Sequence, residues 1–225
     1  MLRVFTSWSG GKDCCLALYR AMKNGLEVRY LANTITEDGQ RSCSHGISSA
    51  VIKAQSQALG IPIVQRRTTN DNYESVFVDM LRGLKRDGIE GCVFGDIDYD
   101  PHREWDEKVC RQAGIKPYLP LWQEDQKALM QEFIDAGFES IIITVKGEFF
   151  GEEMLGKKVD KDFVAHLEEL DKTSDITPAG EAGEYHTLVI DGPIFKKRIE
   201  ILESDTIERK GYWFLQVHQT GLKDK

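Results

Sequence analysis

The sequence predicts an α/β protein whose main domain is a doubly wound parallel sheet, followed by a smaller α+β C-terminal subdomain. Short apolar segments alternate with amphipathic ones through the first two thirds of the 225 residues. Such a β-α-β-α series is stable as a parallel sheet covered by helices on both faces. From Gly147 the pattern loosens into glycine-rich and charged sequence. We therefore predict a first domain over 1–146 and a second over 147–225.

The elements of the first domain follow from periodicity and from glycine stops. Apolar, β-branched segments predict strands at Leu2–Phe5, Val28–Thr34, Ile61–Arg66, Gly91–Gly95 and Ser140–Val145. Helical spacing of apolar residues predicts helices at Cys14–Lys23, Ile47–Leu59, Tyr73–Leu84, His102–Ala113 and Gln126–Ala136. Gly25 and Gly60 end the first two helices. In the third helix, Tyr73–Leu84, the apolar residues on one face, Phe77 among them, are interpreted as core.

The second domain is predicted to hold one helix and three strands. The helix covers Phe163–Leu170, and the strands are Leu188–Ile190, Lys197–Leu202 and Tyr212–Val217. They surround the segment Gly180–Thr187, in which Glu181, Glu184 and His186 are interrupted by glycines. Paired acids near a histidine can handle protons or bind a cation. Composition alone also allows a solvated turn.

The most informative segment joins the first strand to the first helix. It reads Thr6-Ser-Trp-Ser-Gly-Gly-Lys-Asp13. A strand that turns directly into a helix aims backbone N–H groups and the positive end of the helix dipole at one point, which suits a phosphate. Two glycines allow close approach to the backbone, and hydroxyl groups and Lys12 add donors. Asp13 inside an anion site is favourable only against a cation, so we expect it to face Mg²⁺ held on phosphates.

This phosphate loop differs from the common nucleotide motifs. G-x-x-x-x-G-K-[ST] would require Gly at Thr6 and Ser or Thr at Asp13, and G-x-G-x-x-G does not fit. The loop resembles instead the S-G-G-K-D loop of the ATP pyrophosphatase superfamily, whose members release AMP and pyrophosphate. Ligands of such sheets bind at the carboxyl ends of strands. We therefore expect Asn33, Gly95 and Asp96 in the same crevice, although Asp96 could equally be a helix cap.

Composition excludes several functional classes. The net charge is −8 and the pI about 5.2, which argues against binding DNA through its backbone. No apolar run approaches the length of a membrane span, and the N-terminus lacks a signal pattern, so we expect a cytoplasmic protein with no membrane contact. The five cysteines form no C-x-x-C pair, which fits reduced thiols. A homo-oligomer is left open.

Further segments extend the resemblance beyond the phosphate loop. Gly95-Asp-Ile, Pro120-Leu-Trp, Gly180-Glu-Ala-Gly-Glu-Tyr185 and Asp191-Gly-Pro combine with Ser9-Gly-Gly-Lys-Asp13. Together they resemble the diphthine–ammonia ligase, or diphthamide synthase, family over most of the chain. The resemblance implies an adenine nucleotide alpha-hydrolase-like fold and AMP-forming amidation of diphthine on a translation elongation factor by ATP and ammonia. Cys14, where the superfamily loop usually has Ser, and Ala182, often Gly, depart from the pattern.

On this basis we assign roles to the motif residues. ATP is expected to contact Ser7, Ser9, Gly10, Gly11, Lys12, Asp13, Asn33, Gly95 and Asp96, with Mg²⁺ on Asp13 and Asp96. Substrate is expected to contact Glu181, Gly183, Glu184, Tyr185, His186 and Thr187. The residues expected to be catalytic are Lys12, Asp13, Glu181 and Glu184. Alternatives are a related ATP pyrophosphatase that modifies another acceptor, including tRNA, and a nucleotide-binding module without catalysis.

Overall fold

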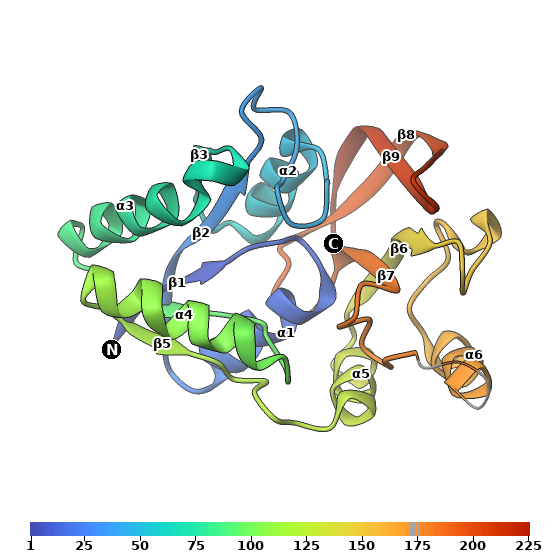
Figure 1. Cartoon of the computed structure of the whole chain (residues 1–225), viewed down its shortest axis with the longest axis horizontal. Helices are drawn as coiled ribbons and strands as arrows, with labels where there is room; N and C mark the ends of the chain where they lie inside the picture. Colours follow the sequence, from blue (N-terminus) through green and yellow to red (C-terminus); the bar gives the residue numbers. More distant parts are fainter. Residues whose placement is uncertain (172–173, 175) are drawn as a thin grey trace.

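Two sheets make up the molecule in a computed structural model, which describes residues 1–171, 174 and 176–225. Figure 1 shows the parallel sheet and its helices on one side and the antiparallel elements of the C-terminal third on the other. The phosphate loop lies between them, at the end of the first strand. No helix in the described part of the chain is both long and apolar enough to cross a membrane.

The first sheet is parallel throughout, with the strand order β3-β2-β1-β4-β5. Its strands are β1 (Arg3–Ser7), β2 (Glu27–Ile35), β3 (Ile63–Arg67), β4 (Gly91–Val93) and β5 (Lys116–Tyr118). The chain runs outward from β1 to one edge and then from β4 to the other. This order places the end of β1 beside the ends of β2 and β4, where a ligand crevice is expected. The predicted doubly wound α/β fold is confirmed.

Helices cover both faces of this sheet because consecutive residues of a strand point to opposite sides. Val4 joins the core shared with α1 (Lys12–Lys23) and α2 (Ser49–Leu59), whereas Phe5 joins the core shared with α3 (Tyr73–Arg86) and α4 (Asp100–Ala113). Ser48 caps α2 by accepting a hydrogen bond from the Ala50 N–H, and Gly60 ends that helix in the left-handed conformation.

The second sheet is antiparallel, with the order β7-β6-β9-β8. It contains β6 (Glu139–Lys146), β7 (Tyr185–Asp191), β8 (Lys197–Arg209) and β9 (Tyr212–Asp224), and the helices α5 (Gln126–Asp135) and α6 (Lys161–Asp171) lie near it. The segment Ser140–Val145 is a strand as predicted, but its place in a parallel series was wrong. Its β-branched residues suit either sheet, so local sequence could not decide between them.

The hairpin β8–β9 also extends farther than predicted, since each strand has 13 residues. The outer ends of both strands carry mostly polar side chains, so hydrophobic periodicity gave no signal for them. The short β5 was not predicted either. The predicted boundary between 146 and 147 stays a prediction. Within the structure, the four-stranded sheet already begins with β6, before that boundary.

Gly95 provides a test of how tightly the parallel sheet is packed against α1. A Cβ atom at this position would lie 2.7 Å from the backbone nitrogen of Cys14 and 2.8 Å from the carbonyl carbon of Asp13. Neither backbone atom can move without displacing the start of α1. We predict that Gly95→Ala lowers the free energy of unfolding by about 1–3 kcal/mol, measured by chemical denaturation.

The control for this substitution is Gly83→Ala, in the last turn of α3. An added Cβ there meets only the end of the Arg86 side chain, at 4.0 Å. Because alanine favours helix over glycine, this variant should be more stable by up to ~1 kcal/mol. Equal effects at the two positions would contradict the close packing described for Gly95.

Candidate active site

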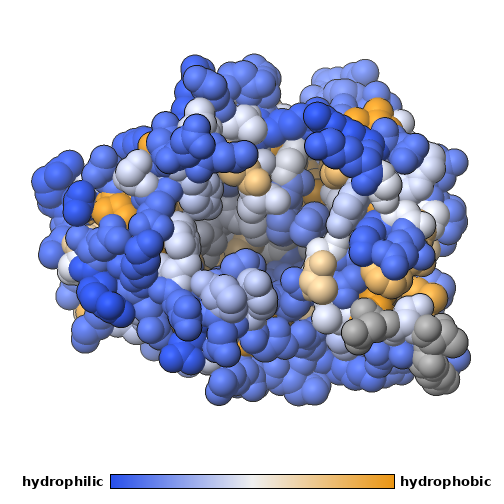
Figure 2. All heavy atoms as spheres, viewed as in Figure 1, coloured by the Kyte–Doolittle hydropathy of each residue, from blue (hydrophilic) through white to orange (hydrophobic). Residues whose placement is uncertain are grey.

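A cavity of about 260 Å³ lies at the carboxyl ends of β1, β2 and β4 and is closed on one side by the segment that precedes β7. Figure 2 shows the molecule hollowed near its centre, with a largely hydrophilic surface around the opening. Residues of both sheets contribute to the lining: Ser7, Ser9, Lys12, Asp13, Asn33, Gly95, Asp96, Glu181, Gly183, Tyr185, His186 and Thr187. All of these were predicted as site residues from the sequence.

The phosphate loop, Ser7–Asp13, is held from behind by Gln55 of α2. The Gln55 amide nitrogen donates to the carbonyl oxygens of Gly10 (2.9 Å) and Val189 (2.8 Å), and its oxygen accepts from the Trp8 indole (2.9 Å). Gly10 has φ +89°, and a Cβ there would lie 2.7 Å from the Gln55 oxygen. Glycine is therefore required at this position both by the backbone conformation and by space. Gly10 supports the loop and does not line the cavity.

Lys12 connects the phosphate loop to the acidic loop, Gly180–Thr187. Its side chain is buried, and its ammonium donates to the Asp13 carboxylate (2.9 Å) and to the carbonyl oxygen of Ala179. It also lies 5.2 Å from the centre of the Tyr185 ring. Burial opposes the charged form of Lys12, but Asp13, Tyr185 and Glu181 together outweigh this effect, and the pKa is raised above its usual value. The cavity therefore keeps a fixed positive charge.

The acidic loop is anchored by residues that the sequence marked as functional. Thr187 Oγ1 accepts a hydrogen bond from the Lys12 backbone N–H (3.0 Å), so one of the loop amides is already engaged. Glu184 is buried and accepts from the Thr177 hydroxyl (2.9 Å) and backbone N–H. Glu184 does not line the cavity. This geometry supports a positioning role in which Glu184 fixes the loop that carries Glu181.

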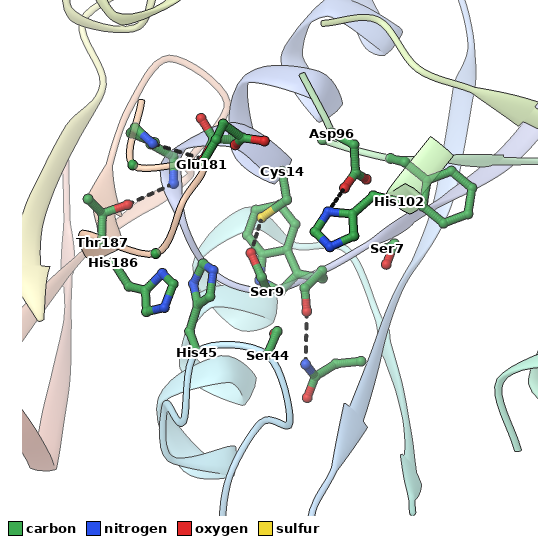
Figure 3. Close-up of a pocket in the computed structure, with 18 of the residues that line it drawn as sticks. Ser7, Ser9, Cys14, Ser44, His45, Asp96, His102, Glu181, His186 and Thr187 are labelled. Atoms are coloured by element: carbon green, nitrogen blue, oxygen red, sulfur yellow. Dashed lines mark hydrogen bonds and ion pairs between the residues drawn. The ribbon is translucent and has the colours of Figure 1, made fainter. Parts of the chain in front are cut away.

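Glu181 is the acidic-loop carboxylate that faces the cavity (Figure 3). Burial raises its pKa to about 7, and the negative charge of Asp13 adds to that rise against the opposing effect of Lys12. A carboxyl group with a pKa near neutrality can take up or release a proton under physiological conditions. The cavity therefore contains a group suited to proton transfer.

Asp96 follows β4 and faces the cavity from the side opposite the acidic loop. Its Oδ1 lies 3.0 Å from Nδ1 of His102 on α4, and this contact raises the pKa of His102. Behind it lies Asp106, which is buried and whose pKa is raised to about 10 by burial and by Asp96. Asp96 is thus held in place by α4, and it does not cap a helix.

Two imidazoles stack against the phosphate loop, and Figure 3 shows them side by side. The rings of His45 and His186 have centres 4.4 Å apart and planes 17° apart. Burial lowers the pKa of His186 to about 4 and that of His45 well below its usual value. A Cβ at Gly11 would lie 2.7 Å from Cε1 of His45. Gly11 therefore supports this contact and does not line the cavity.

Comparison with known proteins agrees with this arrangement. Residues 2–117 match the family described as diphthamide synthase N-terminal domain, and residues 125–223 match the diphthamide synthase C-terminal domain. The chain belongs to the diphthamide synthase family. The resemblance inferred from the sequence motifs is thereby confirmed. The first family match ends at the last strand of the parallel sheet, and the second contains the antiparallel sheet except for its final residue, Asp224.

Curated relatives of this diphthamide synthase family chain are ligases by name. The diphthine–ammonia ligase of Schizosaccharomyces pombe is 30% identical over 92% of this chain and 37% of its own length. That of Rattus norvegicus is 29% identical over 92% of this chain and 85% of its own length. This chain therefore spans little more than a third of the yeast relative. These names agree with the family that the two domain matches show.

One solved structure is also similar. It is described as a predicted subunit of tRNA methyltransferase from Methanocaldococcus jannaschii DSM. It is 16% identical, with a TM-score of 0.45, over 88% of this chain and 100% of that one. No conclusion about function follows from a likeness of this degree.

Several residues that shape the site were not predicted. The helix α3 contributes Tyr73 and Phe77 to the lining, and Phe94 and His102 also face the cavity. Phe77 was interpreted as core; it is 2% exposed and also borders the cavity. An aromatic residue on a helix gives the same sequence signal in either position, so only the fold distinguishes them.

The importance of Gln55 can be tested directly. Replacement by leucine leaves the Trp8 indole and the carbonyl groups of Gly10 and Val189 without their buried partner. We predict that Gln55→Leu lowers the free energy of unfolding by about 2–4 kcal/mol and weakens nucleotide binding measured by calorimetry. Gln57→Leu, an exposed position on the same helix, is the control. Unchanged stability and affinity in Gln55→Leu would show that the loop needs no support from α2.

The raised pKa of Glu181 predicts a pH effect on the ligand-free protein. A carboxyl group whose pKa is higher in the folded state stabilises the fold only while protonated, and this contribution is lost as pH rises through about 7. Between pH 5 and 8, Glu181→Gln should therefore gain stability relative to the wild type, by roughly 1–3 kcal/mol. The exposed Glu203→Gln should follow the wild type. A difference that does not change with pH would refute the shift.

Proposed function

We propose that this protein is an ATP-dependent, AMP-forming ligase that adenylates the carboxylate of diphthine on a translation elongation factor and transfers ammonia to it. The curated relatives carry the name diphthine–ammonia ligase, which supports the acceptor. The observation that carries the proposal is the shared cavity, in which a phosphate loop with a buried lysine faces an acidic loop from the second sheet. One side suits the nucleotide and the other a second substrate.

The cavity has an anion-binding part and an aromatic part that match the phosphates and the base of ATP. The N-terminus of α1, Lys12 and the hydroxyls of Ser7 and Ser9 suit phosphate groups. Tyr73, Phe77 and Phe94 line the same cavity and offer apolar, aromatic contact for a base. Cys14 lies in the first turn of α1. Its thiol donates to the Gly11 carbonyl oxygen (3.2 Å) and accepts from the Ser9 hydroxyl (3.3 Å). The thiol of Cys14 therefore stabilises the phosphate loop through these two hydrogen bonds.

The residues present fit a magnesium ion that arrives with the nucleotide. Asp13, in the first turn of α1, and Asp96, which follows β4, face the same cavity. Mg²⁺ is usually held by one or two carboxylates together with substrate phosphates and water. Among the described residues there is no cluster of three or more metal-ligating side chains, so a cage made by protein alone is not expected. When bound, the ion would neutralise phosphate charge.

The proposed chemistry has two steps. An oxygen of the substrate carboxylate attacks the α-phosphorus of ATP, and the bond from that phosphorus to the bridging oxygen breaks, so that pyrophosphate leaves. Lys12 and the loop amides stabilise the negative charge of pyrophosphate. Ammonia then forms a bond to the carbonyl carbon, AMP leaves with its oxygen, and one proton passes from nitrogen to Glu181, whose pKa of about 7 suits this acceptor role.

Product identity and Lys12 together test this proposal. With ATP, Mg²⁺, ammonium and diphthine-bearing elongation factor, the wild type should release AMP and pyrophosphate, separated by ion-exchange chromatography. Lys12→Ala should lower the turnover by about 10²–10³-fold, because a buried positive charge at the leaving group is lost. Lys23→Ala, at the exposed end of the same helix, should keep full activity. Release of ADP and orthophosphate would overturn the assignment.

A further inference from the structure

A second cavity, of about 240 Å³, lies on the other side of His45 from the first. It is formed between the loop before α2, the strand β6 and the inner face of the hairpin β8–β9, which runs beside α2 in Figure 1. Its wall is mostly apolar, with Ile143, Leu188, Ile207 and Val217 among the contributing side chains. His45 is the one described residue that lines both cavities.

The wall between the cavities has an unusual polar atom. His45 Nδ1 is buried and has no hydrogen-bond partner among the described residues. The same ring stacks on His186, which faces the first cavity, and packs against Gly11 of the phosphate loop. An orphaned buried nitrogen indicates a small polar ligand or water that would satisfy it. A Cβ built on Gly11 would lie 3.1 Å from His45 Nδ1, so this nitrogen lies beside the phosphate loop.

The charged residues around the second cavity favour a neutral ligand over a cation. Arg41 and Arg209 are its two charged lining residues, both exposed, and none of its described lining residues is acidic. A guanidinium stays protonated under all ordinary conditions, so these two side chains repel a cation, which also finds no carboxylate among the described lining residues. A neutral molecule of a few atoms meets neither obstacle. The volume has room for several molecules of water size.

The first cavity offers no equivalent route once it is loaded. The nucleotide and the acceptor carboxylate would both occupy this cavity, and its carboxylates, Asp13, Asp96 and Glu181, attract cations. Ammonium carries no free lone pair and cannot attack an acyl group. The nucleophile must be neutral ammonia, and it must reach the adenylate from a side that the substrates leave open.

We propose that the second cavity admits neutral ammonia and delivers it past His45 to the acyl-adenylate in the first cavity. This inference rests on the proposed function. The nitrogen lone pair forms the new C–N bond, the C–O bond to AMP breaks, and the displaced proton goes to Glu181 as described above. The cavity has no part in adenylation, which requires only ATP and the acceptor.

Filling the second cavity tests this inference. Val217→Trp and Ile207→Trp place a large side chain in it from the two strands of the hairpin, and Gln219→Trp, exposed on β9 outside the cavity, is the control. We expect the KM for ammonium chloride to rise by about tenfold in both filled variants, with amide formation followed by mass spectrometry of the elongation factor. The KM values for ATP and acceptor should stay at wild-type levels.

A second measurement separates this inference from the proposed function. Acceptor-dependent exchange of pyrophosphate into ATP reports adenylation without ammonia, and it also shows that each variant is folded. Absence of exchange in the wild type would refute the proposed function itself. Normal exchange with an unchanged KM for ammonium in the filled variants would overturn the ammonia route. A rise confined to the KM for the acceptor would overturn it as well and assign the cavity to the acceptor chain.

Discussion

The carboxamide of Gln55 holds together the three parts on which the site depends. Its hydrogen bonds join α2 to the phosphate loop at Trp8 and Gly10 and to β7 at Val189. Each of these groups is buried, so each needs a partner within the protein. The backbone N–H of Val189 also donates to the carbonyl oxygen of Gly10 (3.1 Å). The edge of the antiparallel sheet is therefore fixed against the phosphate loop, and the two sheets form a single site.

This attachment explains why the site needs both sheets. The parallel sheet alone supplies a phosphate loop, as in many nucleotide-binding proteins, but the acidic loop comes from the segment before β7. The Lys12 ammonium connects the two loops, since it donates to Asp13 within its own loop and to the carbonyl oxygen of Ala179, the residue just before the acidic loop. Glu184 in turn fixes the acidic loop through Thr177. Glu181 is thereby positioned over the place where phosphate groups are expected.

Much of this arrangement could be predicted from sequence, for physical reasons. Hydrophobic periodicity and glycine stops located the helices, and the turn from β1 into α1 identified the phosphate loop. Contacts between distant segments could not be predicted from the sequence. Gln55 gave no signal beyond that of a polar residue on a helix, and the stacking of His45 on His186 joins positions 141 residues apart. Gly10, Gly11 and Glu184 were predicted to contact ATP or substrate; none of them lines the cavity, and their roles in binding stay predictions. A sequence motif readily identifies the residues that belong to a site, but it does not show which way each side chain points.

We expect the triphosphate of ATP to lie at the N-terminus of α1, with the acidic loop on the opposite side of the cavity. A crystal structure with the α,β-methylene analogue of ATP and Mg²⁺ tests it most directly. We expect phosphate oxygens within hydrogen-bond distance of the phosphate-loop amides and Lys12, and the α-phosphorus facing the Glu181 side of the cavity. An analogue bound elsewhere on the molecule, or bound in this cavity with its base at the phosphate loop, would contradict the proposed position of the triphosphate.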